Sequence, residues 1–65
     1  MKPGDLRRFQ DNAFFANEKE FNGCLFFILP WWTPHNMTIL VNGKKSDCWS
    51  YNILQDNSEP INETR

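Results

Sequence analysis

An Asn-Gly pair at positions 42 and 43 is the feature that most constrains how this chain can fold. The pair follows the segment MTILV, whose side chains alternate in the manner of a half-buried strand. Asn-Gly between strands is the strongest short-range hairpin signal, because a type I′ turn requires positive φ at both central positions. The sequence therefore predicts an antiparallel hairpin with strands at residues 37–41 and 45–50. The alternative is a chance Asn-Gly pair within a loop.

The run CLFFIL at residues 24–29 is the most apolar stretch, and Gly23 and Pro30 bound it. Both its odd and its even positions are apolar, whereas successive side chains of a strand point to opposite faces. We therefore expect a strand that is either covered on both sides, beneath a long loop, or exposed on one face as an interface. Six residues are too few for a spanning helix, which needs about 20.

The remaining segments complete a small all-β architecture. Residues 6–9 favour a first strand, and the polar segment after it, which carries Phe14, Phe15 and Phe21, is typical of a long loop with one helical turn near residues 16–20. A tight turn at residues 50–54 and a short strand at 60–62 follow the hairpin. The 65 residues are enough for one domain only. This order predicts an SH3-like barrel of about five short strands.

Both ends of the chain carry a resemblance to known proteins. The opening MKPGDLRRF resembles the PGDLV start of many SH3-like and KOW-like barrels, in which Gly-Asp turns into the first strand. Together with WSYNILQDNSEPINE near the other end, it is similar to short uncharacterised proteins of marine phages, cyanophages among them. The resemblance covers both ends and the hairpin, and it implies fold and phage origin more than activity. Arg7 departs from the pattern, because such starts carry a core aliphatic side chain there.

No group of residues indicates catalysis, a metal or a cofactor. His35 is the single histidine, and no spacing brings it together with a nucleophile and a carboxylate. Cys24 and Cys48 lack the paired spacing of zinc ligands, and on the second and fourth strands they would lie too far apart for a disulfide. We expect two buried, reduced thiols in a protein that is not an enzyme.

Trp31 and Trp32, with Pro30 and Pro34 on either side, are the strongest candidates for function. Neighbouring residues of a strand point to opposite faces, so at most one indole can lie in the core. The leading hypothesis is a non-enzymatic module that binds a protein partner, or a second copy, through an aromatic surface. That surface would comprise Trp31, Trp32, Trp49 and Tyr51. The alternative is that the second indole closes the barrel mouth under the long loop.

Nucleic-acid binding is the competing hypothesis. Arg7, Arg8, Lys44 and Lys45 could contact phosphates while the tryptophans stack on bases, as in KOW-like barrels. A formal net charge of -1 gives little of the electrostatic attraction on which such binding depends, which disfavours it. MKPGDLRRF is not followed by the apolar segment of a signal peptide. We expect a protein of the infected host cytoplasm or of the virion, neither secreted nor in a membrane.

Overall fold

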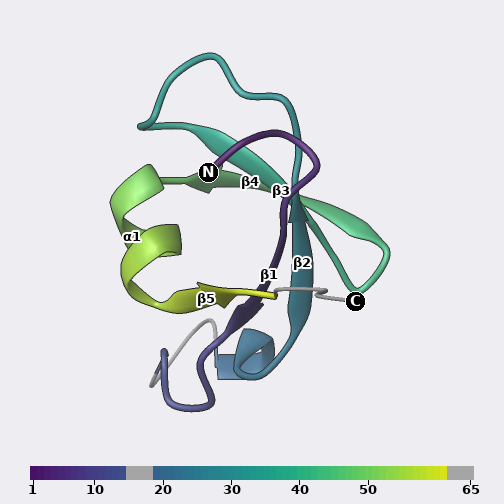
Figure 1. Ribbon diagram of the computed structural model, residues 1–65, viewed down its shortest axis with the longest axis vertical. Coiled ribbons are helices and arrows are strands. Elements are labelled where there is room, and N and C mark those ends of the chain that lie inside the picture. The colour runs from purple at the N-terminus through teal and green to yellow at the C-terminus, as the bar shows by residue number, and fades with distance from the viewer. Residues whose placement is uncertain (15–18, 62–65) are drawn as a thin grey trace.

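The computed structural model, which describes residues 1–14 and 19–61, is a five-stranded antiparallel sheet bent around one core (Figure 1). The elements in chain order are β1 (Leu6–Phe9), η1 (Lys19–Phe21), β2 (Leu25–Ile28), β3 (Met37–Val41), β4 (Lys44–Trp49), α1 (Tyr51–Asp56) and β5 (Ser58–Pro60). The strand order across the sheet is β4-β3-β2-β1-β5. The predicted all-β fold, a small barrel with a long loop after its first strand, is confirmed.

The hairpin of β3 and β4 forms where the Asn-Gly pair predicts it. Asn42 and Gly43 have φ values of 54° and 76°, and Val41 pairs with Lys44 across the turn. β1 and β3 have the predicted bounds, and β2 lies within the predicted run. The short helix α1 replaces the expected tight turn, and β5 begins at residue 58 instead of 60.

Helix α1 forms because its first turn is capped and its inner side is apolar. The Ser50 hydroxyl accepts a hydrogen bond from the Ile53 amide at 3.2 Å, as an N-cap residue does. Leu54, one turn on, is completely buried. The N-cap hydrogen bond and the burial of Leu54 together stabilise six helical residues where the sequence predicted only a tight turn. Near the helical turn expected at residues 16–20, the structure has η1 at Lys19–Phe21, whereas 16–18 lie outside the described residues.

The core lies between the inner face of the bent sheet and α1. Its centre is aromatic: Phe9 stacks on Phe26 with ring centroids 4.2 Å apart, and Trp49 lies 5.4 Å from Phe9. Phe14 and Phe21, from the segment between β1 and β2, pack on the same cluster. The buried apolar residues are Phe9, Phe26, Ile28, Met37, Ile39, Val41, Trp49 and Leu54.

A β-bulge near the end of β4 reverses two of the expected orientations. Ile39 pairs with Ser46 and Met37 with Trp49, so two steps on β3 oppose three on β4. Cys48 has a φ of 69°, the local conformation that absorbs the extra residue. Trp49 therefore turns inward and is only 7% exposed, whereas Cys48 is exposed. The expectations of an outward Trp49 and a buried Cys48 were both wrong, for this one reason.

Candidate interaction surface

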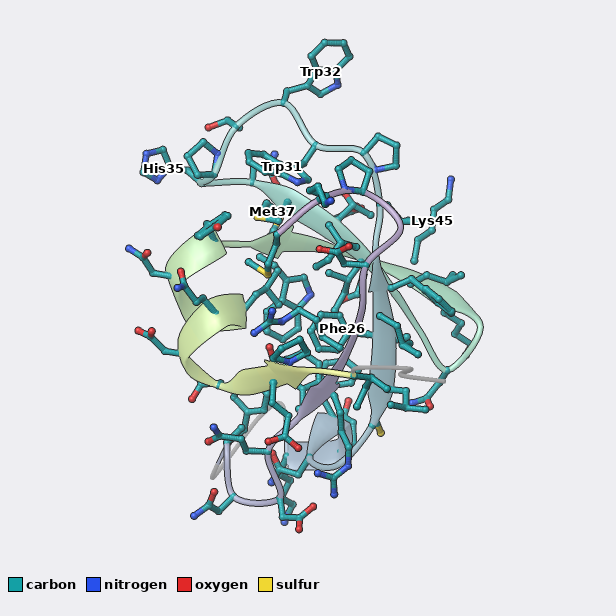
Figure 2. The ribbon with its side chains drawn as sticks, in the orientation of Figure 1. Phe26, Trp31, Trp32, His35, Met37 and Lys45 are labelled. Atoms are coloured by element: carbon teal, nitrogen blue, oxygen red, sulfur yellow. The ribbon has the colours of Figure 1, made fainter. Side chains whose placement is uncertain are left out.

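The loop between β2 and β3, residues 29–36, carries the most exposed aromatic side chain that the structure describes. Trp32 is 100% exposed and points away from the body of the protein, as Figure 2 shows. The prediction that at most one of the two adjacent indoles enters the core is confirmed. The residues lie in a loop and not in a strand, and the loop backbone turns Trp31 inward.

Trp31 and Tyr51 fix the base of this loop. Their rings pack edge to face with centroids 5.9 Å apart, and the Tyr51 amide donates to the Pro34 carbonyl at 2.7 Å. The Tyr51 hydroxyl in turn accepts a hydrogen bond from the Met1 ammonium at 2.9 Å. The loop is thus joined to the start of α1 by side chain and backbone. Trp32 therefore projects from a loop that is held to the rest of the fold by packing and a hydrogen bond.

The structure brings three of the four predicted aromatic residues to the same end of the molecule. Trp31, Trp32 and Tyr51 belong to the loop and its base, whereas the Trp49 indole lies in the core and donates to the Ser46 hydroxyl at 2.8 Å. We define the interaction loop as residues 29–36 together with Tyr51. His35 is exposed on this loop, and its amide donates to the Thr33 hydroxyl. The loop presents an aromatic ring to solvent, in keeping with a binding surface.

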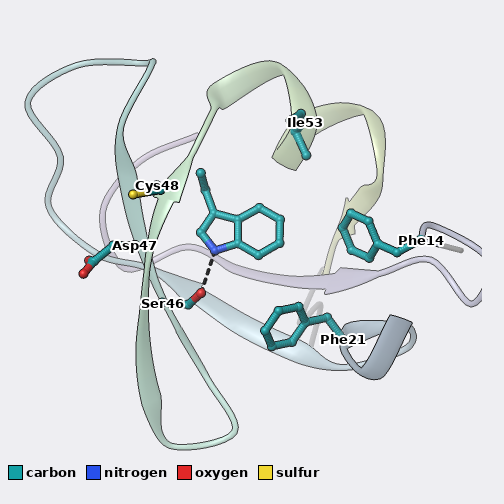
Figure 3. Close-up of a pocket in the computed structure, with 7 residues that line it drawn as sticks. Phe14, Phe21, Ser46, Asp47, Cys48 and Ile53 are labelled. Carbon is teal, nitrogen blue, oxygen red and sulfur yellow. Dashed lines mark hydrogen bonds between the residues drawn. The ribbon is translucent and has the colours of Figure 1, made fainter. Parts of the chain in front are cut away.

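A shallow pocket of about 340 Å³ lies beside the Trp49 ring, between β4, α1 and the segment before β2. Phe14 and Phe21 line one side, and Cys48 and Asp47 lie on the other (Figure 3). Its wall is mostly apolar, and sequence reasoning missed it because the bulge that places Cys48 there has no sequence signature. Within the described part of the chain, no three His, Cys, Asp or Glu side chains gather to hold a metal ion.

The four basic residues of the nucleic-acid hypothesis do not form one free patch. Arg7 donates to Ser58 from the inner side of β1, and Arg8 pairs with Asp11 at 2.8 Å and with Glu59 at 3.4 Å. The Arg8 charge is thus paired with carboxylates, and the Arg7 guanidinium is held by hydrogen bonds to Ser58. Lys44 and Lys45 are exposed on β4.

The second face of β2 is a further apolar surface. Leu25 is 51% and Phe27 44% exposed, whereas Phe26 and Ile28 between and beyond them are buried. The sequence left two alternatives for this strand: covered on both sides, or exposed on one face. Among the described residues, one face of the strand is exposed to solvent. We call this side of the sheet the outer face. The sequence run predicted it as an interface candidate, without indicating which residues would be exposed.

Comparisons with known proteins gave no match: no family model fits the chain, and neither a curated protein nor a solved structure resembles it significantly. No helix among the residues described here is long and apolar enough to cross a lipid bilayer.

Proposed function

We propose that this chain is a non-enzymatic protein-interaction module whose principal contact is Trp32. The observation that carries the proposal is the complete exposure of this indole on a loop that is otherwise tied to the fold. Leaving a large apolar ring in water forgoes the free energy of burying it, about 1.5–3 kcal/mol for a large side chain. Such a ring is compatible with a pocket on another molecule.

The support of the loop favours specific binding over nonspecific contact. Pro30 and Pro34 restrict the backbone on either side of the tryptophan pair, and Trp31 packs on Tyr51. A pre-organised loop loses less conformational entropy on binding than a free one. Tryptophan is also among the residue types most enriched at interface hot spots. The partner we propose is accordingly a protein with an apolar pocket.

The similarity of both chain ends to short marine phage proteins supports a phage origin. Within that origin, we propose a small virion component or an effector that binds a host protein. Neither role requires a catalytic group.

The test compares protein capture by the wild type, Trp32→Ala and Ile53→Ala. Ile53 is 46% exposed on α1, so its replacement is a matched loss of exposed apolar surface away from the loop. Proteins captured from phage-infected cells are quantified by mass spectrometry, and each candidate is purified and titrated against the three chains. We expect Trp32→Ala to weaken binding at least tenfold, a loss of about 1.4 kcal/mol, and Ile53→Ala to leave it unchanged.

Two results would contradict the proposal. One is a purified partner that binds wild type and Trp32→Ala equally well. The other is salt-dependent retention of a single-stranded oligonucleotide that is lost when Lys44 and Lys45 are replaced by alanine, which would favour the nucleic-acid hypothesis.

A further inference from the structure

The chain contains a second Asn-Gly pair, Asn22-Gly23, besides the pair at the hairpin turn. Asparagine followed by glycine is the dipeptide in which the asparagine side chain most readily loses its amide. In this reaction the backbone nitrogen of the next residue attacks the asparagine Cγ, and glycine has no Cβ to hinder the approach. Two sites of the same chemistry thus occur in one chain, and the fold determines how readily each of them reacts.

The backbone of Phe14 holds the side chain of Asn22 at both of its polar atoms. The Asn22 Oδ1 accepts a hydrogen bond from the Phe14 amide at 3.0 Å, and its Nδ2 donates to the Phe14 carbonyl at 2.9 Å. The Gly23 amide donates to the carbonyls of Phe9 and Gln10, at 3.1 and 3.3 Å. Asn22 and Gly23 are also half-buried. The attack would require all of these hydrogen bonds to break, so this pair is protected.

The same groups are accessible at the hairpin turn. Asn42 and Gly43 are both exposed, and a Cβ at Gly43 would meet no atom within 4 Å. The Gly43 amide has no hydrogen-bond acceptor in the part of the chain that the structure describes. The Asn42 Nδ2 contacts only the Cys24 sulfur there, at 3.8 Å, and a thiol sulfur is a weak acceptor. Neither the attacking nitrogen nor the leaving amide is therefore firmly held.

From this contrast we infer that Asn42 is a site of spontaneous deamidation, which reacts far faster than Asn22. The Gly43 nitrogen gives up its proton and forms a bond to the Asn42 Cγ, while the Cγ–Nδ2 bond breaks and ammonia leaves. The product is a cyclic succinimide. Water then adds to either carbonyl carbon of the ring, and the bond from that carbon to the Gly43 nitrogen breaks. Addition at Cγ gives aspartate, and addition at the main-chain carbon gives isoaspartate. One water is consumed for each ammonia released, without oxidation or reduction.

Both products change the hairpin. Each places a new carboxylate beside Lys44 and Lys45, in a chain whose formal net charge is already -1. Isoaspartate also routes the main chain through Cβ and Cγ, which lengthens by one carbon a turn that depends on positive φ at Asn42 and Gly43. The lengthened turn disrupts the pairing of Val41 with Lys44, which closes the hairpin. Ageing of the protein therefore begins at this turn and weakens the contact between β3 and β4.

The first test follows the modified fraction at both asparagines by peptide mass spectrometry, while the folded chain is incubated at mildly alkaline pH. We expect Asn42 to react at least about tenfold faster than Asn22, a difference of about 1.4 kcal/mol in activation free energy. In denaturant, where neither pair is protected, the two rates should converge. Equal rates in the folded chain, an unmodified Asn42, or a difference that persists in denaturant would overturn the inference.

The second test measures the effect on the fold. The aged chains with aspartate and with isoaspartate at position 42 are separated by chromatography and unfolded with urea beside the variant Asn42→Asp. This variant is the matched control, because it carries the new charge without the additional main-chain carbon. We expect the isoaspartate form to unfold at a lower urea concentration than Asn42→Asp. Equal midpoints would contradict the effect on the hairpin.

Discussion

The Arg7 guanidinium donates a hydrogen bond from Nε to the Ser58 hydroxyl at 2.8 Å and from Nη2 to the Ser58 carbonyl at 3.1 Å. Ser58 is buried, and its hydroxyl also donates to the Leu54 carbonyl. A charged side chain thus links the inner side of β1 to β5 and the end of α1. This explains how the chain accommodates an arginine where similar barrel starts have a core aliphatic residue.

Arg7→Met should therefore destabilise the fold. Methionine retains much of the aliphatic stem but loses both donors, and hydrogen bonds to a charged group are worth about 1.5–3 kcal/mol. Urea unfolding followed by tryptophan fluorescence measures the loss. Arg8→Met is the matched control, because its ion pairs are solvent-exposed and are expected to contribute about 0–1 kcal/mol. Equal losses in the two variants would contradict the structural role of Arg7.

The adjacent tryptophans should differ sharply in their effect on stability. Trp31→Ala removes a ring packed on Tyr51 and on the core, and we expect a loss of about 2–3 kcal/mol, below that of a fully buried indole. Trp32→Ala removes a fully exposed ring and should change the free energy of unfolding by less than about 0.5 kcal/mol. Thermal unfolding of both variants provides the measurement. A large loss in the Trp32 variant would mean that its ring packs within the fold.

Gly43→Ala tests the hairpin. A Cβ at this position meets no atom within 4 Å, so any cost comes from the backbone, where φ is 76°. The left-handed conformation costs an L-residue about 1–2 kcal/mol. In a domain of this size each kcal/mol lowers the melting temperature by about 4–8 °C. Asn42→Gly retains the permitted positive φ and should cost less than about 1 kcal/mol. A Gly43 variant as stable as wild type would contradict the turn geometry.

The two cysteines should react with a thiol reagent at different rates. Cys48 is exposed, whereas Cys24 is half-buried and its sulfur donates to the Glu20 carbonyl at 3.4 Å. Thiol modification follows access, so we expect Cys48 to be labelled several-fold faster in the native protein. Cys48→Ser should leave only the slow phase, and denaturant should make the two thiols equivalent. A faster Cys24 would contradict the bulge, which is what places Cys48 outside.

Local signals predicted most of the fold. The Asn-Gly turn and the alternating residues of MTILV fixed the hairpin, and the bounds of β1 and β3 followed from turn residues and period. The helix α1 had a readable signal in Ser50, an N-cap residue type, but six residues followed by a strand are also compatible with a turn. Boundaries in this region depend on how Leu54 enters the core, which is a tertiary effect.

The β4 bulge could not be predicted in the same way. Side chains in a strand alternate between the two faces of the sheet, so the face of each residue is predicted by counting in steps of two. One extra residue in the strand moves every later side chain to the opposite face. Cysteine has no special preference for a positive φ, and Cys48 therefore gave no warning. The candidate aromatic surface consequently included Trp49, which lies in the core. The sequence predicted that at least one of the two adjacent indoles would lie outside the core, without indicating which; the structure shows that it is Trp32.

The same bulge has a consequence for fibril growth. An outermost strand with a regular row of free amides and carbonyls can template the addition of further chains and so begin fibril growth. On β4 the irregular backbone at Cys48 interrupts that row, and on β5 Pro60 lacks an amide hydrogen altogether. The two margins of this sheet thus resist extension by strand addition, which disfavours fibril growth through a shared backbone ladder.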